Sequence, residues 1–184
     1  MSAEAVTTSV ERLRAFDGDD LEDLCEATVA AIEDGGGFGW VKAPARTVLE
    51  AYWNGVLLVP ERALFVARLN GTICGAVQLV GPPKNNEAQS FAAQLTGNFL
   101  APWSRGHGLA RRMIEAIEDA ARAAGFAVLN LDVRATQEAA IGLYETMGFQ
   151  RWGTHPAYAR VEGKVIPGYF YFKRLSGGRG KAKP

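Results

Sequence analysis

A short glycine loop between an apolar strand and a helix is the most constraining feature of this sequence. The strand breaks at Pro102, the loop Arg105–Ala110 (RGHGLA) follows, and a helix then continues to Gly125. Backbone N–H groups at the start of a helix have no intrahelical acceptor, and they lie at the positive end of the helix dipole. The loop therefore predicts an anion site that suits phosphate, and Arg111 and Arg112 add positive charge around it.

The residues of the loop leave more than one interpretation open. Gly106 and Gly108 fit a dinucleotide-binding loop, but Arg111 stands at the place of the third glycine. Asp132 also lies farther along the chain than the usual ribose-binding acid. A Walker loop is excluded, because the sequence has no Gly-Lys-Ser/Thr run. A tight turn without a ligand is disfavoured, because one glycine suffices for a turn and neighbouring arginines would repel one another without an anion.

Hydrophobic periodicity and turn residues predict strands and helices along the whole chain. Asn70-Gly71 predicts a hairpin, and Gly97 predicts a bulge or a close approach by another group. The strand–helix–strand order around the glycine loop predicts a parallel pair, and Glu162-Gly163 lies between two predicted strands. The predicted strands are Val6–Leu13, Ala63–Leu69, Thr72–Val80, Ser90–Leu100, Phe126–Val133, Phe149–Gly153, Ala159–Val161 and Ile166–Lys173. The predicted helices run from Asp17–Asp20 to Ile32, over Arg46–Leu58, from the glycine loop to Gly125, and from a Thr136 cap to Gly148, with a loop at His155–Tyr158.

Composition and charge exclude several classes of function. The 184 residues include 20 basic and 20 acidic side chains, and the zero net charge argues against bulk nucleic-acid binding. No apolar run approaches the roughly 20 residues of a membrane helix, and no signal-peptide pattern begins the chain. Cys25 and Cys74 lack metal-ligand spacing, so we expect buried thiols and no metal site. We expect a cytoplasmic protein that binds neither nucleic acid nor membrane.

Two motifs make the chain similar to a known family. Arg105–Ala110 matches the signature Q/R-x-x-G-x-G/A, and Leu100-Ala101-Pro102 resembles the V-x-P entry before it. Further along, Ala140–Phe149 (AIGLYETMGF) matches A-x-x-L-Y-E-x-x-G-F. The chain therefore resembles the GCN5-related N-acetyltransferases, the GNAT family, from Ala63 to Leu175, while the residues before Ala63 match only in the order of elements.

The resemblance implies an α/β protein with the GNAT fold. In this acyl-CoA N-acyltransferase fold, a mixed and mostly antiparallel central sheet carries helices on both faces. The resemblance also implies a single N-acetyltransferase domain over residues 1–175, with its motif core at 63–175. The remaining residues, 176–184, form a tail whose glycine and basic content predicts disorder.

Acetyl-CoA is the co-substrate that the resemblance implies, with no metal. In this family the backbone of the glycine loop holds the pyrophosphate of CoA, and the preceding strand pairs with the pantetheine arm. An asparagine that often contacts CoA corresponds here to Gln137. The implied cofactor-binding residues are Asn98, Phe99, Leu100, Arg105, Gly106, His107, Gly108, Leu109, Ala110, Arg111, Gln137 and Tyr144.

Direct acetyl transfer to an amine needs a proton donor for the departing thiolate and a base for the amine. Tyr144 resembles the family tyrosine that protonates the thiolate, and its place on an apolar helix face also fits a core residue. Many family members carry a glutamate base where Gln94 stands, and glutamine cannot take the proton. His155 is the candidate base, and the alternatives are Asp132, a water relay, or a structural role for His155.

We therefore expect an N-acetyltransferase that moves the acetyl group of acetyl-CoA directly to a primary amine. A small-molecule acceptor is expected, because aromatic residues such as Tyr52 and Trp53 mark the variable regions and no acidic cluster would attract a polyamine. A homodimer is left open as the assembly. Two alternatives also stay open: a non-catalytic acyl-CoA-binding regulatory module, which the missing glutamate favours, and a dinucleotide-binding protein.

Overall fold

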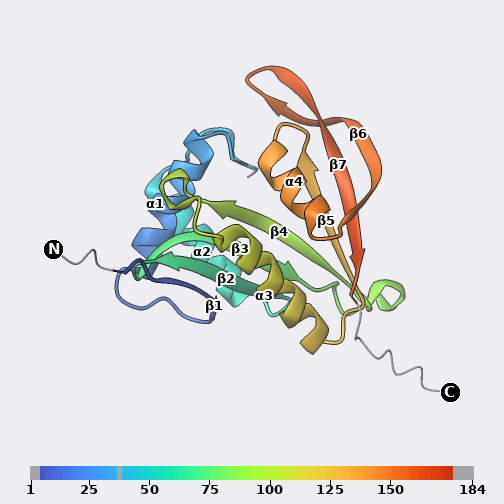
Figure 1. Cartoon of the computed structure of the whole chain (residues 1–184), viewed down its shortest axis with the longest axis horizontal. Helices are drawn as coiled ribbons and strands as arrows, with labels where there is room; N and C mark the ends of the chain where they lie inside the picture. The colour runs from blue at the N-terminus through green and yellow to red at the C-terminus, as the bar shows by residue number, and fades with distance from the viewer. Residues whose placement is uncertain (1–4, 37–38, 176–184) are drawn as a thin grey trace. The chain divides into compact units, whose positions relative to one another are not determined.

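The computed structural model describes residues 5–36 and 39–175, and the predicted tail at 176–184 lies outside them. Figure 1 follows the chain through its helices and strands. None of the described helices is long and apolar enough to cross a membrane. The helical elements are α1 (Asp20–Glu33), α2 (Arg46–Leu58), η1 (Glu87–Gln89), η2 (Pro102–Ser104), α3 (Leu109–Ala123) and α4 (Glu138–Thr146). The strands are β1 (Thr8–Leu13), β2 (Arg62–Leu69), β3 (Thr72–Val80), β4 (Ala92–Leu100), β5 (Val128–Arg134), β6 (Gln150–Val161) and β7 (Lys164–Arg174).

The strands are hydrogen-bonded in the order β1-β2-β3-β4-β5-β7-β6. β1 pairs with β2 antiparallel, and β7 pairs antiparallel with both β5 and β6. β4 and β5 form a parallel pair, with Ala92 opposite Val128 and Gln94 opposite Asn130. The helix between these two strands makes such a crossover possible, as the sequence predicted. The predicted mixed, mostly antiparallel sheet is confirmed.

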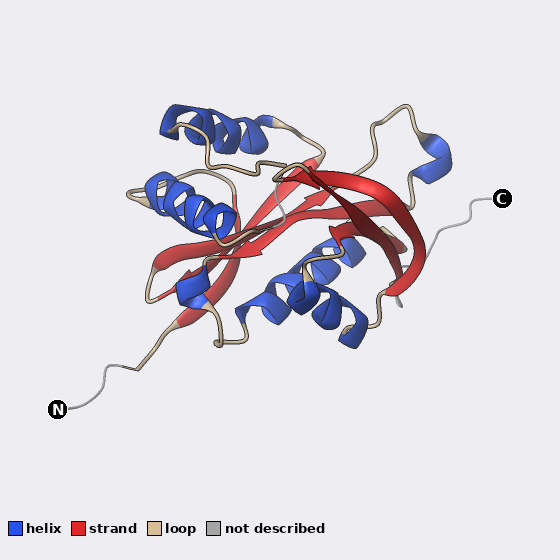
Figure 2. Cartoon of the chain, turned by 90° about the horizontal axis from the view of Figure 1, so that it is seen from above, coloured by secondary structure: helices blue, strands red, loops and turns tan. Residues whose placement is uncertain are grey.

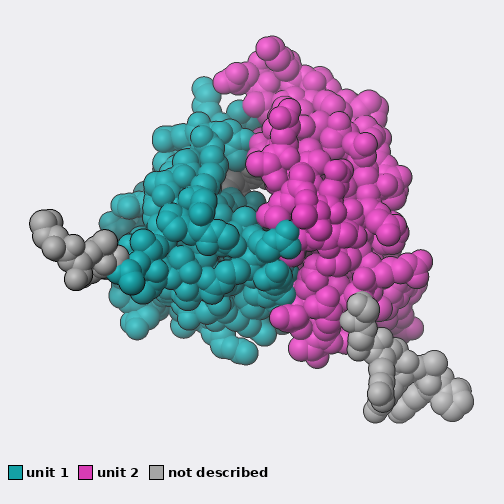
Figure 3. Space-filling view, in the orientation of Figure 1, with its two compact units in different colours: residues 1–78, 97–116 teal, residues 79–96, 117–184 magenta. Residues whose placement is uncertain are grey.

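The chain divides into two compact units, which Figure 3 colours separately. Unit 1 contains residues 1–78 and 97–116, and unit 2 contains residues 79–96 and 117–184. Strands β3 and β4 and helix α3 each pass from one unit into the other. Each unit is therefore assembled from segments that are far apart in the sequence.

The core of unit 1 lies between helices α1 and α2 and strands β2 and β3. Figures 1 and 2 show α1 and α2 on one face of these strands and the start of α3 on the other. Trp53 is fully buried, and its indole N–H donates to the Thr28 hydroxyl oxygen at 3.1 Å. Thr28 in turn donates to the carbonyl oxygen of Leu24 at 2.6 Å. The polar atoms that these helices carry into the core are thus hydrogen-bonded, as burial requires.

Two polar contacts attach helices to strand β7 in unit 2. Glu118 of α3 is only 5% exposed, and it accepts hydrogen bonds from Arg122 at 2.9 Å and from Lys173 of β7. The hydroxyl of Tyr171 donates to Glu145 of α4 at 2.8 Å. A buried carboxylate is costly unless it is paired, so the partners of Glu118 stabilise the docking of α3. Glu145 is exposed, and its bond to Tyr171 adds a single hydrogen bond between α4 and β7.

The predicted hairpin turn at Asn70-Gly71 forms, and Glu162-Gly163 makes a similar turn between two predicted strands. Asn70 and Gly71 have φ values of 51° and 87°, and Glu162 and Gly163 have values of 48° and 79°. Two successive residues with positive φ define the tight turn that suits the twist of paired strands. The local turn chemistry therefore predicted the β2–β3 and β6–β7 connections correctly.

Two local predictions are wrong. The predicted loop His155–Tyr158 lies within strand β6, because pairing with β7 continues around it. Pro156 has no N–H to donate, but β6 is the last strand in the sheet order, where a proline is tolerated. Thr136 does not cap α4, because Gln137 is the N-cap residue and the helix begins at Glu138.

The close approach of β3 and β4 at Gly75 gives a test of the fold. A Cβ on Gly75 would lie 2.4 Å from the carbonyl oxygen of Phe99, a backbone atom. We expect Gly75→Ala to lower the free energy of unfolding by about 1–3 kcal/mol in urea titrations followed by circular dichroism. Gly55→Ala in α2 is the control, because a Cβ there meets nothing within 4 Å. This substitution should raise the free energy of unfolding by about 0.5–1 kcal/mol, since alanine is favoured over glycine inside a helix. Unchanged stability of Gly75→Ala would contradict the close approach.

Candidate functional site

A tight turn and two left-handed glycines shape the loop at the start of α3. The buried Ser104 of η2 donates its hydroxyl to the carbonyl oxygen of Ala101 at 2.8 Å. His107 donates from Nδ1 to the carbonyl oxygen of Ser104 at 3.1 Å, because a carbonyl oxygen can only accept. Gly106 and Gly108 have φ values of 84° and 73°, which glycine adopts without a steric penalty. These contacts fix the path of the loop before any ligand binds.

The loop leaves a run of backbone donors open. The first N–H beyond it that has an acceptor belongs to Arg112, which donates to the carbonyl oxygen of Gly108 at 3.3 Å. Among the described residues, the N–H groups from Gly106 to Arg111 have no acceptor. A Cβ on Gly106 or Gly108 would meet nothing within 4 Å, so the loop has free space in front of it. Open donors at the positive end of a 15-residue helix fit the oxygens of a phosphate or pyrophosphate.

The three arginines near the loop differ in their partners. Arg105 forms an ion pair with Asp34 at the end of α1, with 2.6 Å between Nη2 and Oδ2. Arg112 donates to the Thr8 hydroxyl oxygen at 2.7 Å. Arg105 therefore has a carboxylate that balances its charge, whereas the Thr8 hydroxyl beside Arg112 is uncharged. Arg111 is exposed and has no ion pair among the described residues, so it is the cation available to a bound anion.

Strand β4 bends just before the residues that were predicted to contact pantetheine. Gly97 has a φ of 59°, and a Cβ there would lie 3.1 Å from Nε2 of Gln78, so the close approach that the sequence offered as an alternative to a bulge is present. Phe99 is 7% exposed, and its ring lies 6.2 Å from that of Trp53, which anchors the strand end in the core of unit 1. Asn98 and Leu100 flank it. These residues and the glycine loop all belong to unit 1, and Pro102 separates them along the chain.

Tyr144 and Gln137 lie on α4, in unit 2. Tyr144 is 5% exposed, and its ring packs edge-on against Phe149 with 5.7 Å between centroids. Gln137 is the N-cap residue of the helix, but its side chain makes no capping hydrogen bond. The packing of Tyr144 is that of a core residue, and a phenol that stays protonated at neutral pH can also donate a proton.

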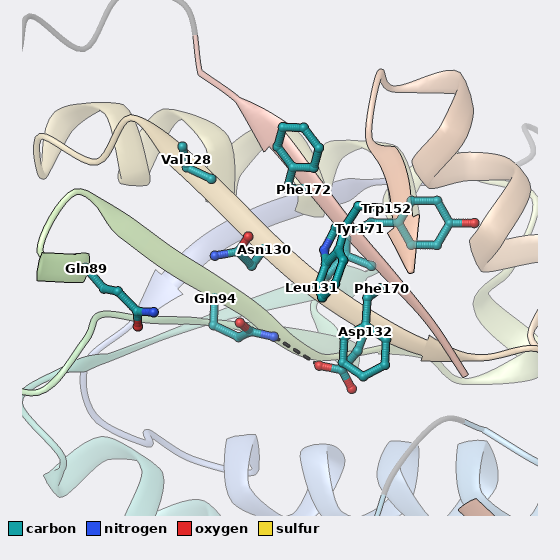
Figure 4. A pocket seen from close by; sticks show the side chains of 10 residues that line it. All are labelled: Gln89, Gln94, Val128, Asn130, Leu131, Asp132, Trp152, Phe170, Tyr171 and Phe172. Atoms are coloured by element: carbon teal, nitrogen blue, oxygen red, sulfur yellow. Dashed lines mark hydrogen bonds between the residues drawn. The ribbon is translucent and has the colours of Figure 1, made fainter. Parts of the chain in front are cut away.

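A hydrogen-bonded carboxylate lies in a cavity of unit 2 (Figure 4). Gln94 of β4 donates from Nε2 to Oδ1 of Asp132 at 3.0 Å, and the hydroxyl of Tyr158 in β6 donates to Oδ2. Both oxygens of Asp132 therefore have one fixed donor and further lone pairs to share. The cavity has a volume of about 570 Å³, and its lining residues are Gln89, Gln94, Val128, Asn130, Leu131, Asp132, Trp152, Phe170, Tyr171 and Phe172.

Sequence reasoning did not connect Tyr158 with Asp132. The two residues are 26 positions apart, and Tyr158 stood in a segment that was predicted as a loop. Burial of the ring raises the pKa of Tyr158 above its ordinary value of about 10, and the hydrogen bond and charge of Asp132 raise it further. Tyr158 is therefore a permanent donor to Asp132 at neutral pH.

The predicted base His155 is exposed in strand β6. Its Nδ1 accepts a hydrogen bond from the N–H of Ala157 at 3.1 Å. In the neutral ring this arrangement puts the proton on Nε2, so the single basic lone pair is already engaged. The described residues contain no cluster of His, Cys, Asp or Glu that could hold a metal ion, and Cys25 and Cys74 are buried free thiols.

The chain is similar in sequence to known acetyltransferases. Residues 23–149 match the model of the acetyltransferase (GNAT) family. Over 129 residues, 70% of this chain and 77% of the relative, it is 60% identical to an uncharacterized N-acetyltransferase in the hisH–hisA intergenic region of Azospirillum brasilense. Over 113 residues, 61% of this chain and 68% of the relative, it is 32% identical to the N-alpha-acetyltransferase RimI of Mycobacterium tuberculosis.

The fold is also that of a solved acetyltransferase. A GNAT superfamily phosphinothricin acetyltransferase from Sinorhizobium meliloti, in complex with acetyl-CoA, matches with a TM-score of 0.77. The match covers 97% of this chain and 92% of that one at 18% sequence identity. At this identity the likeness concerns the fold alone.

The raised pKa of Tyr158 predicts a loss of stability at high pH. The protonated Tyr158 hydroxyl contributes fully to the free energy of unfolding below its unfolded-state pKa of about 10. This contribution is lost as the pH rises through the higher pKa of the folded state. We expect wild type to be more stable than Tyr158→Phe at pH 8, with the difference in unfolding free energy smaller at pH 10.5. Urea unfolding at both pH values checks this, with Val165→Ala, an exposed non-titrating site in β7, as the control. A difference that does not shrink would contradict the raised pKa of Tyr158.

Proposed function

Because the chain belongs to the GNAT family of acetyltransferases, we propose that it transfers the acetyl group of acetyl-CoA directly to a primary amine of a small molecule. Family membership makes the protein an acetyltransferase with acetyl-CoA as co-substrate, and the GNAT fold implied by the sequence is confirmed. The small-molecule acceptor and the roles of single residues are the proposal.

The observation that carries the proposal is the set of open donors at the start of α3. We propose that the N–H groups of the loop bind the pyrophosphate of CoA, with the Arg111 guanidinium as an added contact. Strand β4 offers Asn98–Leu100 to the amides of pantetheine, which can pair with a strand without any charge. Gln137 has an amide that can donate to CoA. The full proposed set is Asn98, Phe99, Leu100, Arg105, Gly106, His107, Gly108, Leu109, Ala110, Arg111, Gln137 and Tyr144.

The reaction divides into three tasks for the protein. Acetyl-CoA supplies an acyl group activated as a thioester. A backbone N–H near Leu100 is proposed to donate to the thioester oxygen as negative charge develops on it. Tyr144 is proposed to protonate the departing thiolate, because a phenol with a pKa of about 10 is protonated at neutral pH. The third task is to take the proton of the amine, whose own pKa is also about 10.

We propose that Asp132 takes the amine proton. The Nδ1 lone pair of His155 is engaged by Ala157, which counts against the predicted role of His155 as the base. The Asp132 carboxylate has lone pairs left after its bonds to Gln94 and Tyr158. The role of His155 stays a prediction, and His155→Ala belongs in the same activity assay as Asp132→Asn.

Removing the hydroxyl of Tyr144 tests the acid step. We expect Tyr144→Phe to lower kcat about 100-fold, since a positioned general acid contributes on this scale. The KM for acetyl-CoA should stay within about twofold, because the ring and its packing against Phe149 remain. Thiol release from acetyl-CoA across a panel of primary amines measures both constants. Tyr169→Phe, a matched change in β7, should leave kcat unchanged.

The outcomes of that assay separate the competing functions. If the protein binds CoA but no amine on the panel supports thiol release, the non-catalytic acyl-CoA-binding module is favoured. Stabilisation of the protein against heat by NAD but not by CoA would favour dinucleotide binding. A wild-type rate in Tyr144→Phe would remove the acid role and leave the acetyl transfer itself standing.

Truncating Arg111 tests the proposed pyrophosphate contact. We expect Arg111→Ala to weaken CoA binding about tenfold in calorimetry, because a charge-assisted hydrogen bond to phosphate is lost. Acetylpantetheine lacks the pyrophosphate, so its KM as an acetyl donor should not respond to this substitution. Arg160→Ala, at an exposed position of β6, is the control. Equal losses for CoA and acetylpantetheine would place Arg111 outside the phosphate site.

A further inference from the structure

We infer that the cavity of unit 2 binds the acceptor as a singly charged ammonium ion, held by Asp132 against the aromatic rings of Trp152 and Phe170. The inference rests on the proposed function and names the class of its acceptor: a small primary amine with one cationic group and an aromatic or apolar body. Figure 4 shows Asp132 beside these rings in the cavity.

The charge balance of the cavity selects a monocation. Of the ten described residues that line it, Asp132 alone carries a charge. Among these ten lining residues, an acidic acceptor would therefore find no cation to pair with, and a polyamine would find a single carboxylate.

The aromatic wall suits the body of such an amine. Trp152 is 65% exposed, and its ring lies 5.6 Å from that of Phe170. An exposed tryptophan beside a carboxylate offers apolar surface for stacking and a π-face for a cation. The carboxamides of Gln89 and Asn130 also line the cavity and can bond to uncharged polar substituents. A volume of about 570 Å³ lies within the range of small-molecule sites.

Asp132 is positioned by a ring that needs a glycine beneath it. The Tyr158 side chain, which donates to Asp132, packs directly over the backbone of Gly168. A Cβ on Gly168 would lie 2.2 Å from Cγ of Tyr158, so any side chain there would displace the ring. Tyr158 also packs edge-on against Phe170, with 5.9 Å between centroids. Tyr158 and Gly168 therefore act as positioning residues for the carboxylate.

Matched ligands separate the charge of the acceptor from its shape. The probes are 2-phenylethylamine, a cation at pH 7, and its uncharged isostere 2-phenylethanol, measured by calorimetry on the full chain saturated with CoA. We expect wild type to bind the amine at least about tenfold more tightly than the alcohol, and Asp132→Asn to lose that preference. Asp119→Asn, an exposed carboxylate on α3, should keep it. An amine preference that is absent in wild type or retained in Asp132→Asn would overturn the inference.

The positioning residues have their own variants. Tyr158→Phe should lower the amine preference at least about threefold without changing alcohol binding, because only the hydroxyl is lost. Gly168→Ala should also lower the amine preference, or it should unfold the β6–β7 hairpin. Gly153→Ala, where a Cβ has room, should keep both the amine preference and the folded hairpin. Full amine preference in Tyr158→Phe would remove its positioning role. Tighter binding of an alanine-initiated peptide than of 2-phenylethylamine would overturn the small-molecule class.

Turnover distinguishes failure of this inference from failure of the proposed function. Amine binding that depends on Asp132, without thiol release from acetyl-CoA, would contradict the transfer reaction and leave the ammonium site standing. If thiol is released and the KM for the amine is the same in Asp132→Asn as in wild type, the ammonium site is contradicted and the transfer reaction stands.

Discussion

The start of a helix leaves backbone donors without acceptors, and this chain keeps those of α3 uncovered. A serine or aspartate at the cap position would satisfy one of these donors from within the protein. Gly108 holds that position and has no side chain, and Gly106 turns the backbone before it with a positive φ. The ion pair between Arg105 and Asp34 balances charge beside the loop without using its donors. Contacts within the protein thus set the conformation of the loop, and an anion bound by these donors would require little further ordering.

Local physics made much of the fold predictable from the sequence. Asn70-Gly71 adopts the positive φ values that a two-residue hairpin needs, and few other residue pairs do so at low cost. The parallel pairing of β4 and β5 followed from the helix between them. The glycine loop was predictable for the same reason, because its conformation depends on neighbours within a few positions.

The carboxylate cluster was not predictable, because its geometry depends on contacts between distant segments. Gln94 and Asp132 are 38 positions apart, and Tyr158 reaches the same carboxylate from a third strand. The segment around Tyr158 has the composition of a loop, yet pairing with β7 extends β6 through it. Gly168 gave no local signal of its role, since the need for a glycine arises only when the Tyr158 ring lies over it.

The same contacts give a physical meaning to Gln94, which stands where the resemblance expects the glutamate of many family members. Gln94 donates an amide hydrogen to Asp132, which a glutamate could do only if it were protonated. Two ionised carboxylates at this distance would repel each other and raise the pKa of one of them. An amide on β4 is therefore the partner that a carboxylate on β5 requires. Gln94 therefore fixes the Asp132 carboxylate in the cavity of unit 2 with a donor that brings no second negative charge.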